Sequence, residues 1–302
     1  YHEVIEHARW DAKKLVDDWQ ARMEGMENRD RLEWDVYRIK RDMVSRETRW
    51  AVSEAWRSIG EMHLNRGDLQ AAYAACRWGM EEDRNNGRLH MLLGEIHERE
   101  GDRESAIVTV ATAARLMHGD GYPFYRLGEL LRTNGLSREA WRCFEEAARL
   151  SPEVPLPWRM LGFMAVVRGF HRKATDFYRK AIEIDPDHAG SWNDMGYAYA
   201  CMGQGEAAID AARQAVKLER TQHTWETLGK AYAVAGRPGL AIKCFLRSIS
   251  LDWYHGEAWY SLGKEYLSTG RREKAVEVLE QLKRIDIAWA GSLSTVIEGE
   301  GA

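Results

Sequence analysis

Residues 222–255 read QHTWETLGKAYAVAGRPGLAIKCFLRSISLDWYH, and this stretch decides the fold. The glycine at its position 8, Gly229, belongs to a column that recurs at intervals of 34, 34, 34, 34, 33 and 34 residues. The column consists of Gly60, Gly94, Gly128, Gly162, Gly196, Gly229 and Gly263. A fixed period of about 20 to 50 residues indicates a repeat protein, in which each repeat buries its apolar face only against its neighbours.

Counted from this glycine, the repeats share two further columns. A second glycine follows seven residues later in each, and we expect it to end the first helix in a left-handed turn. These glycines are Gly67, Gly101, Gly135, Gly169, Gly203, Gly236 and Gly270. Five residues beyond stands an alanine in every repeat, which predicts two helix backbones that cross closely. The alanines are Ala72, Ala106, Ala140, Ala174, Ala208, Ala241 and Ala275.

The remaining columns complete a motif: tryptophan at position 4, leucine at 7, glycine at 8, tyrosine at 11, glycine at 15, alanine at 20 and an aromatic residue at 24. This motif resembles the tetratricopeptide repeat family over residues 53–289. The resemblance implies an all-α fold, a right-handed α-solenoid superhelix of seven antiparallel helix pairs, with the first helix of each pair lining a concave groove. Position 11 departs from tyrosine at His63, His97, Leu131 and Ala165.

We expect three parts in the chain. Residues 1–52 form helices that either cap the first repeat or dock a partner, the second because Trp10, Trp19 and Trp34 are more aromatic surface than a cap requires. Residues 53–289 form the seven repeats. Residues 290–302 hold the end of a capping helix, predicted from the four-residue spacing of apolar side chains, and a polar, flexible tail.

Composition argues against several classes of protein. The chain has 43 basic and 47 acidic side chains in 302 residues, a balance that disfavours a nucleic-acid-binding surface. It has no run of 18 apolar residues, so we expect no transmembrane segment. Four scattered cysteines indicate small core residues in a reducing, cytoplasmic compartment. They are Cys76, Cys143, Cys201 and Cys244.

We find no pattern typical of a catalytic or metal site. Close cysteine or histidine pairs are absent from the sequence, so we predict no metal and no cofactor. His63, His90 and His97 occupy positions 11, 4 and 11 of the first two repeats, and we interpret them as replacements for packed aromatic residues. No motif places a nucleophile beside a base, so we expect no catalytic residues and no enzyme activity.

The resemblance implies that positions 2, 5, 9, 12 and 13 of each first helix face the groove. Position 9 changes from acidic through aromatic to basic: Glu61, Glu95, Glu129, Phe163, Tyr197, Lys230 and Lys264. Other candidate groove residues near the middle are Arg159, Val166, Val167 and Asn193. Apolar side chains on such a wall usually mark a contact surface. Alternatively, the charges form pairs within a solvated helix, since Arg57 precedes Glu61 by four residues.

Three functions compete. The first is a non-enzymatic scaffold or adaptor that binds another protein or peptide in the groove, with Phe163 and Tyr197 as anchors. The second is the recognition arm or subunit of a larger enzyme or assembly whose chemistry lies elsewhere. The third, an RNA-binding helical repeat, is weakest because basic and stacking residues do not recur in one column.

Overall fold

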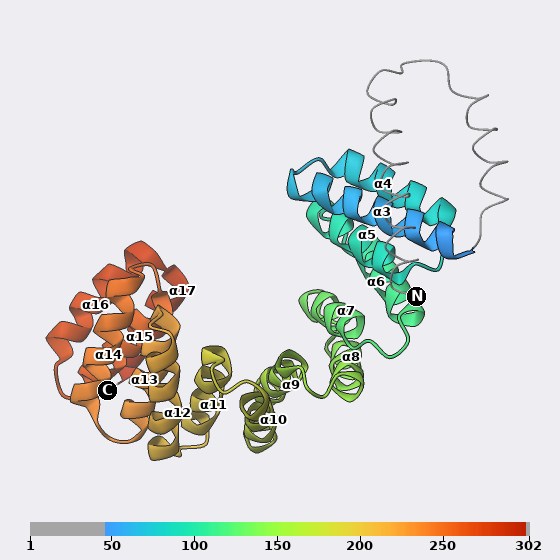
Figure 1. Cartoon of the computed structure of the whole chain (residues 1–302). Coiled ribbons are helices and arrows are strands. Elements are labelled where there is room, and N and C mark those ends of the chain that lie inside the picture. The colour runs from blue at the N-terminus through green and yellow to red at the C-terminus, as the bar shows by residue number, and fades with distance from the viewer. Residues whose placement is uncertain (1–45, 300–302) are drawn as a thin grey trace. The chain divides into compact units, whose positions relative to one another are not determined.

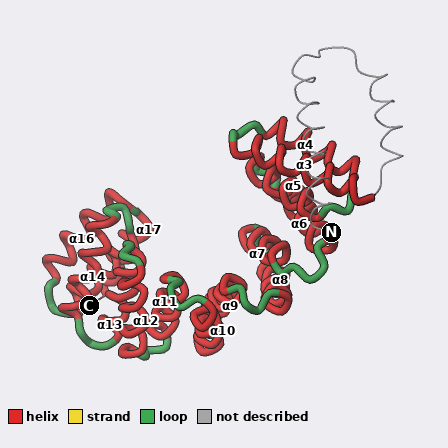
Figure 2. The backbone as a smooth tube through the Cα atoms, viewed as in Figure 1, coloured by secondary structure: helices red, strands yellow, loops and turns green. Residues whose placement is uncertain are grey.

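The computed structural model describes residues 46–299, and every regular element in that range is an α-helix (Figure 1, Figure 2). In chain order the helices are α3 (Arg46–Asn65), α4 (Leu69–Glu82), α5 (Gly87–Glu100), α6 (Arg103–Leu116), α7 (Tyr122–Thr133), α8 (Ser137–Leu150), α9 (Pro155–Val167), α10 (His171–Ile184), α11 (Ala189–Cys201), α12 (Gly205–Leu218), α13 (Gln222–Val234), α14 (Pro238–Leu251), α15 (Gly256–Ser268), α16 (Arg272–Ile285) and α17 (Ile287–Gly299). The first fourteen form seven pairs of a helix A and a helix B, which confirms the predicted all-α architecture.

The chain divides into two compact units, with the boundary between Ser151 and Pro152. The first unit contains α3 to α8, which are three helix pairs, and the second contains α9 to α17, which are four pairs and a final helix. Within each unit, each helix A packs against its own helix B, and each helix B packs against the next helix A along the chain or, for α16, against α17.

The second glycine column ends helix A as predicted, because all seven of its members have φ between 70° and 81°. At Gly101 the backbone N–H of the following residue, Asp102, donates to the His97 carbonyl at 2.9 Å. This hydrogen bond satisfies a carbonyl that the helix end would leave without a partner. The Asp102 side chain then accepts from the Ser105 N–H at 3.0 Å and caps α6. One short turn therefore stops one helix and starts the next.

The alanine column lies at the crossing of helix A and helix B, and all seven alanines are fully buried. At three of the crossings a glycine of the first column, Gly60, Gly94 or Gly196, faces the backbone carbonyl of this alanine. An added Cβ on Gly196, for example, would lie 3.3 Å from the Ala208 carbonyl oxygen. Small residues on both sides thus allow the close crossing that the sequence predicts.

A helix passes through each of the two expected domain boundaries. Helix α3 passes through Ser53 without a break, because neither glycine nor proline interrupts the helix there. At the other end, α17 already begins at Ile287, so the expected boundary between 289 and 290 falls inside it. Helix α17 covers the last pair, since Leu293 is fully buried and the Trp289 ring lies 4.9 Å from the Tyr260 ring. Residues 1–45 and 300–302, with most of the predicted N-terminal helices and the tail, lie outside the described residues.

Candidate binding surface

The A helices α9 and α11 of the second unit carry the predicted apolar contact residues. Phe163 is 39% exposed and Val167 is 71% exposed, both on α9, and Tyr197 on α11 is 37% exposed. Val166, which lies between Phe163 and Val167 in the sequence of α9, is half-buried. Large apolar side chains normally lie inside a soluble protein, so a group of them on neighbouring helices is an informative surface feature.

Polar residues border this group. The Arg159 Nε on α9 donates to Asp194 Oδ2 on α11 at 2.8 Å, and this ion pair ties the two helices together. Beside it, the buried side-chain oxygen Oδ1 of Asn193 accepts no hydrogen bond within the protein. A buried acceptor of this kind gains free energy when a donor reaches it.

Lys230 on α13 is held in a network of charged and aromatic groups. Its Nζ lies 2.6 Å from Glu226 Oε1, 2.5 Å from Glu257 Oε1 and 5.1 Å from the centre of the Tyr197 ring. Burial alone would lower the pKa of Lys230, but the two carboxylates outweigh burial and raise that pKa. Lys230 is therefore charged and already compensated, and Tyr197 receives its cation–π contact from it.

His255, the residue before α15, completes this network. Its Nε2 lies 2.6 Å from Glu226 Oε2. Burial would raise the pKa of Glu226, yet the hydrogen bond from His255 and the charge of Lys230 hold that pKa below its ordinary value. Lys264 stands outside the network: it is exposed, and its Nζ lies 5.7 Å from the centre of the Tyr260 ring.

The three acidic position-9 residues lie in the first unit, and each has an arginine of its own helix as partner. Arg57 pairs with Glu61 on α3. Arg99 pairs with Glu95 on α5 at 2.9 Å. On α7, Arg126 lies 3.4 Å from Glu129 and also donates to Glu98 of α5 at 2.7 Å. These pairs match the alternative of intrahelical pairing on a solvated face.

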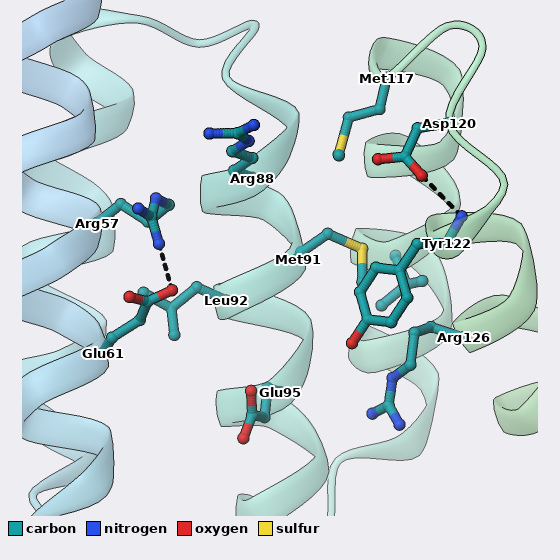
Figure 3. A pocket seen from close by; sticks show the side chains of 11 residues that line it. Arg57, Glu61, Arg88, Met91, Leu92, Glu95, Met117, Asp120, Tyr122 and Arg126 are labelled. Atoms are coloured by element: carbon teal, nitrogen blue, oxygen red, sulfur yellow. Dashed lines mark hydrogen bonds and ion pairs between the residues drawn. The ribbon is translucent and has the colours of Figure 1, made fainter. Parts of the chain in front are cut away.

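The first unit also has a pocket of about 300 Å³, which the sequence analysis did not find. Figure 3 shows Arg57 and Glu61 on α3, Met91 and Glu95 on α5, and the 117–126 segment on the far wall. The lining combines charged groups with two thioethers and the exposed ring of Tyr122. A mixed lining of this kind suits an amphipathic side chain rather than a purely apolar one.

The three histidines that occupy nearby columns of the sequence each have a different partner. His63 Nδ1 lies 4.0 Å from Asp68, His90 Nε2 lies 3.1 Å from the Arg84 carbonyl, and the His97 ring packs edge-on against Tyr73. Among residues 46–299, a different set of side chains that can hold a metal ion comes together: His223, Glu226 and His255. The sequence could have indicated this set, because the three residues lie at the N-terminal ends of two consecutive A helices, α13 and α15.

The four cysteines are free thiols, and burial raises the pKa of three of them. These pKa values are about 12 for Cys76 and about 11 for Cys143 and Cys244. A raised pKa reduces the thiolate, which is the nucleophilic form. Across the part of the chain that the structure describes, no helix combines the length and apolar character needed to cross a membrane.

Two stretches of the sequence match models of a known protein family. Residues 177–210 and 256–286 each match a family model described as tetratricopeptide repeat. No protein of curated function matches the sequence significantly.

Solved structures with the same fold are similar over much of the chain. A tetratricopeptide repeat protein from Parabacteroides merdae is 14% identical with a TM-score of 0.63, over 82% of this chain and 98% of that one. A chain of the APC/C hetero-tetramer Cut9–Hcn1 is 23% identical with a TM-score of 0.59, over 76% of this chain and 45% of that one. YrrB, described as a TPR protein with an unusual peptide-binding site, is 18% identical with a TM-score of 0.52, over 62% of this chain and 97% of that one. The present chain thus spans less than half of the Cut9–Hcn1 chain.

Proposed function

We propose, on the premise that this chain is a tetratricopeptide repeat protein, that it is a non-catalytic adaptor and binds a partner protein through helices α9 and α11. Folds of this family generally mediate protein–protein interaction. The observation that carries the proposal is the group of exposed apolar side chains Phe163, Val167 and Tyr197 on these neighbouring A helices. Exposed apolar groups lower solubility unless a partner covers them.

The surrounding residues support a peptide or protein segment as the ligand. Aromatic side chains at the centre of an interface commonly contribute about 2 kcal/mol or more each when a partner desolvates them. Arg159 and Lys230 are already paired, so they hold the wall in place rather than select an acidic ligand.

The test compares capture of partners from native lysate by the wild type and by the double variant Phe163→Asp, Tyr197→Asp. A matched control is the double variant Leu240→Asp, Leu246→Asp on helix B α14, where the side chains are 40% and 45% exposed. We expect mass spectrometry to identify a partner that only the α9/α11 variant loses. Circular dichroism checks that both variants fold. Equal capture by all three proteins would contradict the proposal.

The pocket of the first unit favours the second candidate, a subunit of a larger assembly, because it is a separate surface with different chemistry. The substitution Met91→Asp, in the pocket wall, tests this function. We expect this variant to lose one component of a co-purified complex and to keep the partner held by α9 and α11. Co-purification of every component with this variant would exclude the pocket as a contact.

A further inference from the structure

Three side chains that commonly bind metals converge in the second unit, on the other side of Lys230 Nζ from the Tyr197 ring in the chain of contacts described above. His223 and Glu226 are three residues apart on α13, so they share one face of the helix, and His255 directly precedes α15. One ligand atom from each lies within 4.8 Å of the other two. We propose that His223, Glu226 and His255 bind one divalent transition-metal ion, with zinc as the representative ion.

The donor set decides the class of ion. Two imidazole nitrogens and one carboxylate oxygen are a set that binds Zn²⁺ with one coordination position left for water. Similar sets bind Fe²⁺, whereas Ca²⁺ and Mg²⁺ prefer oxygen ligands alone. The set contains no thiolate, so it does not favour soft monovalent copper.

The distances allow an ion to enter with small movements. His255 Nε2 and Glu226 Oε2 are 2.6 Å apart and form a hydrogen bond. Tetrahedral bonds to zinc of about 2.0–2.2 Å need these atoms about 3.3–3.6 Å apart, so the pair opens by about 1 Å or less as the ion replaces the proton. His223 is exposed, and its ring meets that of His255 edge-on at 5.0 Å. Rotation of the His223 side chain closes the remaining distance.

Neighbouring groups orient the carboxylate and balance its charge. Glu226 is only 6% exposed, and Lys230 Nζ at 2.6 Å binds its other oxygen, Oε1. This contact points Oε2 toward the histidines, as hydrogen bonds to metal-binding carboxylates commonly do. Lys230 is itself paired with Glu257 at 2.5 Å. The two carboxylates therefore offset the ammonium, and Glu257, in the first turn of α15, also offsets the positive N-terminal end of that helix.

Binding would join consecutive repeats, because the ligands come from α13 and from the residue before α15. The ion would stabilise the folded state, since the unfolded chain does not assemble the three ligands. One coordination position would remain for water or for a group supplied by a partner. This inference goes beyond partner binding by α9 and α11 and does not depend on it.

The test is calorimetric titration of the metal-free full chain, prepared without a histidine tag, with zinc chloride. We expect one ion per chain and a higher melting temperature with zinc. The substitution His223→Ala should weaken binding by at least about 10-fold to 100-fold, since even loss of a group that only orients a ligand has that effect. Controls are His118→Ala, an exposed histidine of the first unit, and Cys201→Ser, the exposed cysteine. Both should bind as the wild type does.

The outcomes separate the proposal from its alternatives. Because His223 is exposed, His223→Ala should keep the wild-type circular dichroism spectrum and its melting temperature without zinc. Visible absorption of bound Co²⁺ gives a second readout, and we expect its bands to disappear in His223→Ala and in Glu226→Gln. Absence of zinc binding would overturn the proposal. Equal affinity of wild type and His223→Ala would also overturn it and would indicate an adventitious ion only.

Discussion

Gly162 on α9 shows how a missing side chain sets the distance between two helices. The ring of Tyr178 on α10 is fully buried, and a Cβ added to Gly162 would lie 2.5 Å from Tyr178 Cε1. Carbon atoms in contact prefer about 3.5–4.0 Å, so even a methyl group does not fit. The ring edge occupies the volume that a side chain would need.

We therefore expect Gly162→Ala to destabilise the protein, although alanine favours a helix more than glycine does. Overpacking of this kind typically costs about 1–3 kcal/mol. The control is Gly291→Ala on α17, where no atom lies within 4 Å of the added Cβ, and which should be neutral or slightly stabilising. Urea denaturation of both variants measures the change. A stable Gly162→Ala variant would mean that the tyrosine ring moves aside at little cost.

The position of Phe163 and Tyr197 on helix A follows from the repeat columns, whereas the partners of Lys230 do not. A column lists one position in every repeat, but Glu226 and Glu257 reach Lys230 from other columns, one on its own helix and one on the next helix A. Considering one column at a time therefore predicts a basic residue at position 9, but it does not predict the two carboxylates that pair with that residue. The pocket beside Met91 was missed for a similar reason, since three separate segments build it.

At the scale of the helix, the turns were predictable because one residue type decides each of them. The second glycine column alone adopts a left-handed conformation at the end of every helix A. Helix α3 carries no such marker at the expected boundary near Ser53, because neither glycine nor proline interrupts the helix there. Helix starts depend on individual caps, and the side chain of Asp102 is one of them.

The cap at Asp102 makes the stability of α6 depend on pH. Hydrogen bonds from Ser105 lower the pKa of Asp102 below its ordinary 3.8. A carboxyl group with a lowered pKa stabilises the folded state above its unfolded pKa, and this stabilisation is lost as the pH falls through the folded-state pKa. The difference in melting temperature between wild type and Asp102→Ala should thus be largest near neutral pH and shrink below about pH 4.

Thermal melts at a series of pH values measure this difference. Asp210→Ala serves as the control, because Asp210 is an exposed residue within α12 and caps no helix. A difference for Asp102→Ala that stays constant down to acidic pH would show that the side chain acts by something other than its charge.

At the scale of the whole chain, stability is distributed among neighbours. Within each of the two compact units, neighbouring repeats contact each other. In such arrays the stability is close to a sum of repeat and interface contributions. A change at one end should therefore remain local.

Hydrogen exchange in the variant Leu293→Ala tests this locality. Leu293 on α17 is fully buried against Gly263, and its truncation should cost about 2–5 kcal/mol. We expect faster exchange in α15, α16 and α17, while α3 to α8 exchange as in the wild type. Faster exchange throughout residues 46–299 would show that the chain unfolds as one cooperative body.

The buried alanine at every crossing has a consequence for design. Because all seven alanines are fully buried at the contact between helix A and helix B, the helix pairs share one common joint. Pairs with a common joint are interchangeable modules, and a repeat could be duplicated, exchanged or deleted without redesigning how its own two helices meet. The joint sets how the two helices of a module pack, and the solvent-facing positions can vary to bind different partners.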